Sequence, residues 1–253
     1  MTVELWLGHE FETTHERRAL DRFMADMQAE FDQSEDFCLV LANYYIDGRQ
    51  IDLTVLKPEA VIVIELKECA KPIQATENGD WITIPEGEII GTGGQNPFEQ
   101  VKAYRFKWVN FLEKQSHKFL PAAKIRSMDF GQVSAFIVLC PEFHPDSKIL
   151  IPRLRWLRIV GLDKLSQVVS QEVAQKLNFA KPEMKKLVTE VLRLKRADTI
   201  SGEVQPRNKL ARLVALPDMA EFTHPREFIL HGDRCRIGRS DQCQIVVNDN
   251  FVS

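Results

Sequence analysis

Residues 51–67, IDLTVLKPEAVIVIELK, predict two antiparallel strands joined by a tight turn at residues 57–60. Proline favours the second position of such a turn, so Pro58 places the axis of the hairpin between residues 58 and 59. Pairing outward from this axis puts Thr54 opposite Val63 and Asp52 opposite Glu65. The hairpin therefore brings two carboxylates face to face.

The opposed carboxylates share their face of the hairpin with a lysine. Directly opposed like charges are destabilising unless a cation neutralises them, and carboxylate oxygens are suited to Mg²⁺, with Mn²⁺ as an alternative. Lys67 follows Glu65 by two residues, so its charge can stabilise a phosphate near the metal. The competing interpretation is a surface ion pair between Glu65 and Lys67, with Asp52 unrelated. The opposed register and the apolar second face of the strand favour metal-assisted phosphodiester hydrolysis.

The composition is that of a globular chain with a sizeable core. The protein has 253 residues, of which 44% are hydrophobic and 27% charged, which excludes a disordered or fibrous class. An acidic N-terminus and short apolar runs predict a soluble, cytoplasmic protein without a membrane span. Five cysteines without a CxxC pair predict neither a disulfide framework nor a zinc site, and we expect reduced, buried thiols.

The net charge of −3 conceals an uneven distribution. Residues 1–90 carry a net charge of −12, residues 91–195 carry +9, and the remainder balances. An acidic segment beside a basic one suits a protein that holds both a cation and a polyanion. Solvated helix faces of opposite sign are the alternative.

Hydrophobic periodicity predicts an alternation of helices and strands. A helix is expected over residues 13–31, and another begins after Asn96, whose side chain can cap it, and runs to about residue 115. Strands are expected at 37–46, 50–56, 61–67, 81–84, 132–140 and 154–160, and further helices at 163–177 and 182–195.

In combination these elements resemble the nuclease-related domain (NERD) of the PD-(D/E)xK superfamily over roughly residues 8–165. The matching features are Glu16 on the first helix, Ile51-Asp52, Glu65-Leu66-Lys67 and the helix start Asn96-Pro97-Phe98-Glu99-Gln100. The resemblance implies an α/β fold of the restriction-endonuclease type, with a mixed sheet flanked by helices. It also implies Mg²⁺ near Asp52, Glu65 and the Leu66 carbonyl, and Lys67 as the catalytic lysine. Ile51 stands where the superfamily often has proline.

Glu16 has two interpretations. It shares a helix face with apolar residues, and a carboxylate that faces the core needs a partner or a metal, so it is a candidate third acidic residue of the catalytic site. Alternatively, Thr13 and Glu16 form a capping box. Glu12 competes for the same position in the family pattern.

The helix after Asn96 carries further candidates. Gln100 and Tyr104 lie four residues apart on one face and resemble the Q-x-x-x-Y signature of RecB-type nucleases, where such side chains approach the nucleic acid near the metal. This makes Gln100 a catalytic candidate and Tyr104 a nucleic-acid contact, although an ordinary amphipathic helix gives the same pattern. Lys102, Arg105 and Lys107 are predicted phosphate contacts, with simple solvation as the alternative.

The C-terminal part resembles the beginning of a forkhead-associated (FHA) domain. After a polar linker at 196–209, residues 210–253 contain short strand-like pieces and Gly238-Arg239-Ser240. In that family the loop and a later serine contact phosphothreonine, which implies roles for Arg239, Ser240 and Ser253. A complete FHA domain has about 100 residues, so we expect a truncated module. The predicted organisation is a nuclease domain at 1–165, a helical extension at 166–195, the linker and this fragment.

The sequence thus predicts a Mg²⁺-dependent nuclease that acts on nucleic acid, more readily on DNA than on RNA. A phosphothreonine protein is a second partner if the FHA domain is complete. The alternative is a catalytically silent nucleic-acid-binding or signalling adaptor that retains the nuclease fold. The intact Asp52, Glu65 and Lys67 favour the enzyme.

Overall fold

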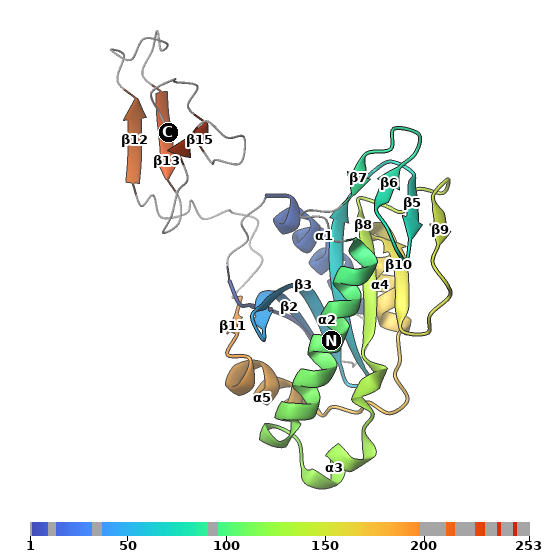
Figure 1. The fold of residues 1–253 in the computed structure, drawn as a ribbon. Helices are drawn as coiled ribbons and strands as arrows, with labels where there is room; N and C mark the ends of the chain where they lie inside the picture. The colour runs from blue at the N-terminus through green and yellow to red at the C-terminus, as the bar shows by residue number, and fades with distance from the viewer. Residues whose placement is uncertain are drawn as a thin grey trace. The chain divides into compact units, whose positions relative to one another are not determined.

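A computed structural model describes residues 2–9, 14–31, 37–90 and 96–197, together with four short strands nearer the C-terminus. The chain divides into two compact units, Met1–Asp198 and Thr199–Ser253 (Figure 1). Each unit is described separately. No helix in the described ranges is long and apolar enough to cross a membrane.

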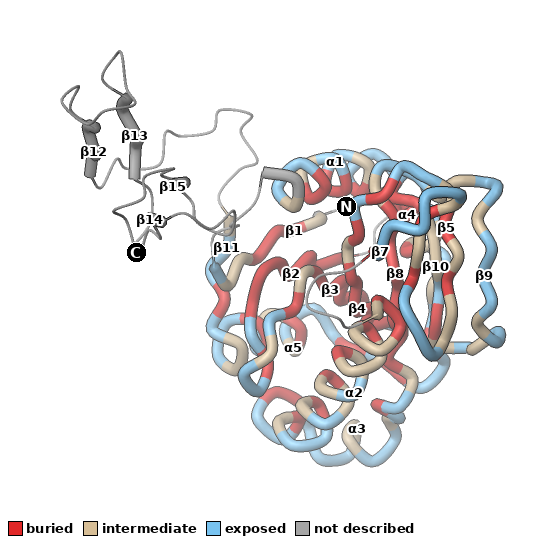
Figure 2. Tube along the Cα trace, turned by 45° about the horizontal axis from the view of Figure 1, so that its top comes forward, coloured by how far each residue is buried: buried red, intermediate tan, exposed pale blue. Residues whose placement is uncertain are grey.

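The first unit is built on a mixed seven-stranded sheet. Its order is β10-β8-β4-β3-β2-β1-β11, and its central strands are buried along most of their length (Figure 2). An antiparallel meander of β2, β3 and β4 forms the middle of the sheet. On one side β8 pairs in parallel with β4, and β10 pairs in parallel with β8. On the other side β1 pairs in parallel with β2, and β11 pairs antiparallel with β1. The strands are β1 (Thr2–Leu7), β2 (Phe37–Ile46), β3 (Arg49–Lys57), β4 (Ala60–Glu68), β8 (Ser134–Cys140), β10 (Leu157–Gly161) and β11 (Lys195–Arg196). The predicted mixed sheet with flanking helices is confirmed.

Helices cover both faces of this sheet (Figure 1). One face packs against α1 (Thr14–Phe31) and α4 (Leu162–Gln171), and the other against α2 (Pro97–Gln115). Trp108 and Leu112 of α2 are fully buried in the same apolar core as Val61 and Val63 of β4. Shorter helical segments are α3 (Ala122–Ser127), α5 (Lys181–Lys186), a π-helical turn (Leu187–Val191) and 3₁₀ turns at Ser116–Lys118 and Phe130–Gln132.

The start of α2 follows the predicted cap. The Asn96 side chain accepts a hydrogen bond from the Glu99 amide at 2.7 Å, and Pro97 occupies the first turn, where no amide donor is needed. The Asn96 amide also donates to the carbonyls of Glu77 and Gly79 at 2.9 and 3.0 Å. One side chain therefore caps the helix and fixes it to the preceding loop.

That loop belongs to a small second sheet within the first unit. Its order is β7-β6-β5-β9, with β5 (Ile73–Thr76), β6 (Trp81–Thr83), β7 (Ile89–Ile90) and β9 (Lys148–Leu150). Of these strands, the sequence predicted only the one at residues 81–84. The others have two to four residues, which is too short for hydrophobic alternation to be recognised.

The predicted helices at 163–177 and 182–195 are too long. α4 ends at Gln171, and two backbone amides of the following segment bond to the hairpin turn rather than continuing the helix. The Ala174 amide donates to the Glu59 carbonyl and the Phe179 amide to the Pro58 carbonyl, both at 2.7 Å. The second helical region ends at Val191, and the chain then enters the large sheet as β11. Apolar residues in both segments face the core without being helical.

The described part of the second unit consists of two strand pairs. β12 (Ala211–Ala215) pairs antiparallel with β13 (Arg226–Leu230), and β14 (Ile237–Gly238) pairs in parallel with β15 (Ile245–Val246). All four strands lie within residues 210–253, where the sequence predicts short strand-like pieces at 210–216, 226–231, 234–238 and 244–247. Arg239, Ser240 and Ser253 lie outside the described residues.

Candidate active site

The β3–β4 hairpin has the register predicted from Pro58. Thr54 pairs with Val63 and Leu53 with Ile64, and regular pairing ends there. At the next position outward, the Asp52 carboxylate accepts a hydrogen bond from the Leu66 amide at 3.1 Å. A side-chain oxygen thus takes the place of a backbone acceptor. In a strand the amide and carbonyl of one residue point the same way, so the Leu66 carbonyl also faces this end of β3.

Glu65 and Lys67 lie beneath α2 in a connected set of polar side chains. Glu65 is 1% exposed and Lys67 is 9% exposed. The Lys67 ammonium donates to Glu65 Oε1 and, at 3.1 Å, to Gln100 Oε1. Gln100 Nε2 in turn donates to the Tyr104 hydroxyl at 2.9 Å. The structure therefore brings Asp52, Glu65, Lys67, Gln100 and Tyr104 together.

Burial favours the neutral forms of the three acidic side chains of this cluster, Asp52, Glu65 and Tyr104, by raising the pKa of each. Desolvation, followed by the negative charge of Glu65, raises the pKa of Asp52 to about 8. Desolvation also raises the pKa of Glu65, although the Lys67 charge opposes it. The pKa of Tyr104 is raised by burial and then by the charges of Glu65 and Asp52. The two carboxylates cannot both be ionised without cost unless a further positive charge is present.

The oxygen atoms of this cluster are suited to binding a hard divalent cation. Glu65 Oε2 is buried without a hydrogen-bond partner among the described residues, while its other oxygen holds Lys67. Asp52 and the Leu66 carbonyl supply further oxygen donors, which Mg²⁺ prefers. The described part of the chain holds no group of three or more His, Cys, Asp and Glu side chains arranged for a metal. The protein would therefore contribute two carboxylates and a carbonyl, which leaves room for water and phosphate oxygens.

A cleft of about 990 Å³ opens onto this cluster. One wall comes from α1, with Glu16, Arg18 and Arg22, and another from β6 and β7 of the small sheet. Glu16 thus lies in the same cleft as Asp52 and Glu65. Its proposed capping partner Thr13 and its competitor Glu12 are outside the described residues.

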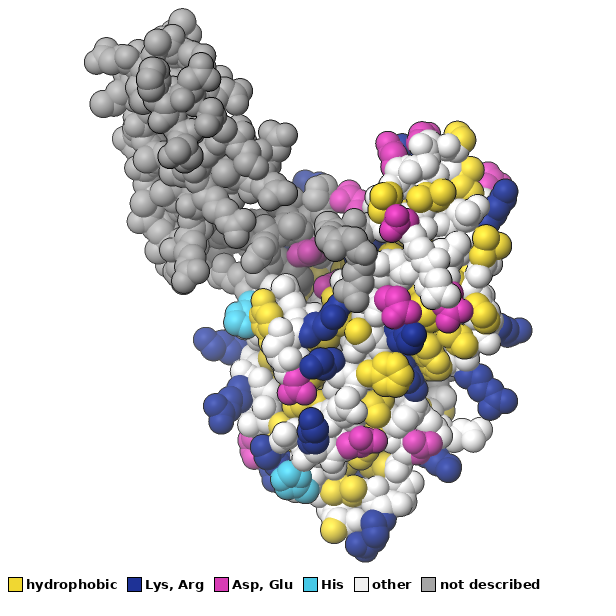
Figure 3. All heavy atoms as spheres, viewed as in Figure 1, with side chains coloured by type: hydrophobic (Ala, Val, Ile, Leu, Met, Phe, Trp, Pro, Cys, Tyr) yellow, Lys and Arg dark blue, Asp and Glu magenta, His cyan; other side chains and the backbone are white. Residues whose placement is uncertain are grey.

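The three predicted phosphate contacts on α2 do not line this cleft. Lys102 pairs with Glu99 at 3.1 Å and Lys107 donates to the Asp47 carbonyl at 3.4 Å. The Arg105 guanidinium donates to the Val133 carbonyl at 2.8 Å and to that of Gly131, and its partial burial lowers its pKa. Figure 3 shows lysines, arginines and carboxylates interspersed over the face of the first unit on which α2 lies. Neither positive nor negative side chains dominate that face.

Arg18 and Arg22 were missed by the sequence analysis. Both are exposed, lie four residues apart on α1 and line the cleft. They belong to the segment of net charge −12, so counting charges along the chain gave no signal for them. Only the tertiary packing of α1 brings them to the carboxylates.

Comparison with protein families shows that residues 12–139 match the nuclease-related domain (NERD). The match takes in α1, the hairpin, α2 and nearly all of β8, and so includes every residue of the buried cluster. No curated protein and no solved structure matches the chain.

Proposed function

The chain belongs to the nuclease-related domain family, and we propose that it is a Mg²⁺-dependent nuclease, with DNA as the expected substrate. One observation carries this proposal: Asp52, Glu65 and Lys67 meet at the end of β4, and one Glu65 oxygen is buried without a hydrogen-bond partner among the described residues. The family alone supports a nuclease-related function.

In this proposal Asp52, Glu65 and the Leu66 carbonyl hold the cation. Bound there, Mg²⁺ would supply positive charge that stabilises the attacked phosphate and acidifies a water molecule. Asp52 must lose its proton to act as a ligand, because burial favours its neutral form. The Leu66 amide then stabilises the carboxylate that is formed, since a hydrogen bond to a charged acceptor is a strong one.

Lys67 acts at the reacting phosphate in this proposal. Its ammonium is held between Glu65 Oε1 and Gln100 Oε1, so it is oriented before substrate binds. It can donate a hydrogen bond to a phosphate oxygen on which negative charge develops. Because Gln100 donates to Tyr104, its oxygen is directed at Lys67. Gln100 is therefore a positioning residue in this scheme.

The charges around the cleft indicate how nucleic acid would bind. The lining includes the carboxylates of Glu16, Asp52, Glu65, Glu68 and Glu88 and the cations of Arg18, Arg22, Lys67 and Lys71. The carboxylates outnumber the cations in this lining, so a polyanion is repelled until a divalent cation or a proton offsets part of the negative charge. Arg18 and Arg22 then form the cationic part of the α1 wall, and we propose that they contact the phosphates next to the cleaved bond.

Reversing Arg18 and Arg22 to glutamate is therefore expected to weaken nucleic-acid binding by about a hundredfold at low salt. The slope of log Kd against log salt should fall by about 2, because two phosphate contacts are lost. Fluorescence anisotropy of a labelled duplex in Ca²⁺ measures both quantities. Stability should change little, since the Arg22–Asp26 pair is exposed and 3.8 Å long.

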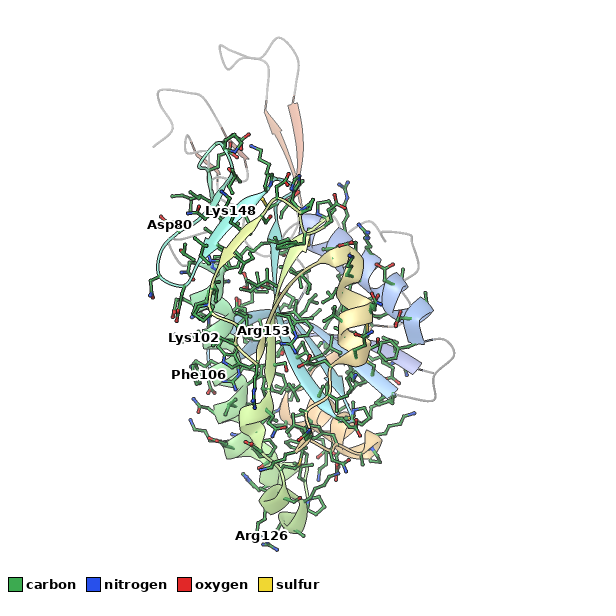
Figure 4. The ribbon with its side chains drawn as sticks, turned by 90° about the vertical axis from the view of Figure 1, so that its right-hand side faces the viewer. Asp80, Lys102, Phe106, Arg126, Lys148 and Arg153 are labelled. Carbon is green, nitrogen blue, oxygen red and sulfur yellow. The ribbon has the colours of Figure 1, made fainter. Side chains whose placement is uncertain are left out.

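The matched control is the double variant Lys102→Glu and Lys107→Glu, which changes the net charge equally. Figure 4 shows Lys102 and Phe106 on the outer side of α2, where Phe106 is 50% exposed. These lysines would contact only a strand that extends beyond the cleft, so their reversal should cost less affinity. If the lysine pair matters more than the arginine pair, the nucleic acid binds along α2 and the cleft assignment is wrong.

The nuclease proposal is tested by incubating the purified 253-residue protein with linear, circular and single-stranded DNA and with RNA. Cleavage is expected with Mg²⁺ or Mn²⁺ and should stop in EDTA. Binding without cleavage under every metal condition would instead identify the catalytically silent adaptor. Cleavage that survives EDTA would show that the hairpin does not act through a cation.

We also propose that residues 210–253 contribute to a phosphothreonine-binding FHA module. The support is the sequence resemblance around Arg239, since its guanidinium can bind phosphate through two hydrogen bonds. Titration with phosphothreonine peptides tests this proposal. Micromolar binding that Arg239→Ala abolishes would show that this segment is a working module, and binding that Arg239→Ala leaves unchanged would contradict the role of Arg239.

A further inference from the structure

Asn43 has a backbone conformation that is unusual inside a strand. Its φ is +48°, in the left-handed region, although it lies in the middle of β2 and is 4% exposed. The other described non-glycine residues with positive φ are Asp47, in a turn, and Arg193, after a helical segment. This conformation is strained for most residues and less so for asparagine. A mid-strand occurrence therefore needs a structural reason.

The side-chain alternation of β2 and β3 changes phase at this point. In β2 the α2-side core contains Leu39 and Leu41, then Tyr44 and Ile46. β3 shows the same change, because Leu56 and Ile51 both belong to that core although they are an odd number of residues apart. Both strands thus shift by one residue at the same level of the sheet.

Asn43 and Asp52 stand opposite each other where this shift occurs. Ala42 pairs with Leu53 and Tyr44 pairs with Ile51, while the position between them, Asn43 opposite Asp52, is not paired. On its other side, Asp52 lies just beyond the last regular pair of the β3–β4 ladder. Asp52 is therefore outside regular pairing with both neighbouring strands.

Asn43 is held in place by hydrogen bonds from the segment that follows β1 and from β3. The His9 amide donates to the Asn43 carbonyl at 2.8 Å, and the Asn43 side-chain amide donates to the His9 carbonyl at 3.3 Å. From β3, Gln50 donates to Asn43 Oδ1 at 2.6 Å. Gly8 permits this close approach, because a Cβ there would lie 2.5 Å from the Tyr44 Cβ.

We infer that Asn43 is a positioning residue for Asp52. Its left-handed backbone and its two-sided hydrogen bonding keep the β2–β3 ladder open at Asp52, so that this carboxylate can turn to the Leu66 amide and face Glu65. The inference rests on the proposed function only in taking Asp52 as a cation ligand. The position of the carboxylate itself can be measured without metal or substrate.

Two measurements test this inference. Amide hydrogen exchange at Leu66, relative to Val63 in the same strand, reports whether the Asp52 carboxylate still accepts its hydrogen bond. Calorimetric titration with Mn²⁺ reports the affinity of the site. Asn43→Ala strains the left-handed backbone and removes the side-chain bonds, whereas Asn43→Gly relieves the backbone and removes only the bonds. Asp47→Ala imposes similar strain in the exposed turn, away from the site.

We expect Asn43→Ala to speed Leu66 exchange by about tenfold relative to Val63 and to weaken Mn²⁺ binding by a similar factor. Asn43→Gly should restore part of the protection of the Leu66 amide and part of the Mn²⁺ affinity. Asp47→Ala should lower the melting temperature without changing the exchange ratio or the Mn²⁺ affinity. If Asn43→Ala lowers stability but leaves the Leu66-to-Val63 ratio unchanged, Asn43 is merely structural. If Asn43→Ala does not fold, Asn43→Gly becomes the test. An unchanged ratio of Leu66 to Val63 exchange in Asn43→Gly would show that the Asn43 side chain does not position Asp52. Absence of Mn²⁺ binding by the parent protein would refute the metal site, while the exchange ratio still decides the positioning role.

Discussion

Replacing Lys67 by alanine is expected to reduce the rate of nucleic-acid cleavage by about a thousandfold or more, with folding retained. Lys67 is the only cation in the described structure that donates to both Glu65 and Gln100, so no neighbour can replace it at the phosphate. Glu65→Gln should cause a loss of similar size through the metal, because an amide is a poor ligand for Mg²⁺. Single-turnover cleavage of a labelled duplex measures both effects.

Lys164→Ala is the matched control, since this lysine is exposed on α4 and does not line the cleft. Lys67→Arg separates charge from shape, because arginine keeps the charge but not the compact ammonium that fits between two oxygens. If Lys67→Ala cleaves as fast as the parent and the control, the hairpin is not the active site.

Asp52→Asn is expected to stabilise the metal-free protein in alkaline solution by several kcal/mol, about 3 to 5. The pKa of Asp52 is about 8 in the folded protein, against an ordinary value of about 3.9 when the chain unfolds. Between these values the folded state holds a proton that the unfolded state has lost, so the free energy of unfolding falls as pH rises towards 8. Asparagine is neutral throughout and removes this loss.

Thermal unfolding in EDTA at pH 4 and pH 9 tests this expectation. The variant and the parent should melt at similar temperatures at pH 4 and diverge at pH 9, with the exposed Asp80→Asn as control. Mg²⁺ should narrow the difference at pH 9, because it stabilises only the form with the carboxylate. A variant that is less stable than the parent at pH 9 would mean that Asp52 is ionised and well compensated without metal.

The sequence was sufficient to predict the hairpin and the helix that follows it. Strand alternation and Pro58 together determine one register, and a shift by one residue would have turned Asp52 and Glu65 away from each other. Asn96 and Pro97 likewise define where α2 begins, because both residues meet a local need of the helix end. These features depend on neighbours in sequence, so their signals are present in the sequence.

The rest of the site depends on contacts between distant segments. Nothing in the sequence indicates that Gln100 accepts from Lys67, or that Arg18 lies across a cleft from Asp52. The phase change at Asn43 was also not predicted, since residues 37–46 read as one continuous apolar strand. Three of the four strands of the small sheet, β5, β7 and β9, are too short to leave a recognisable pattern. In each case tertiary packing supplies information that local periodicity lacks.

The hairpin turn has a further consequence for how this domain can be divided. Its carbonyls at Pro58 and Glu59 accept hydrogen bonds from residues 179 and 174, and the buried Lys57 ammonium donates to the carbonyls of Val169 and Ser170 at the end of α4. All four partners lie beyond residue 139, where the family match ends. A recombinant fragment cut at that boundary would leave a buried lysine without these acceptors, at the turn of the same hairpin that carries Asp52 and Glu65. A fragment that keeps these contacts must therefore extend past residue 139, at least to residue 179, and β11 at residues 195–196 then adds an edge strand to the sheet.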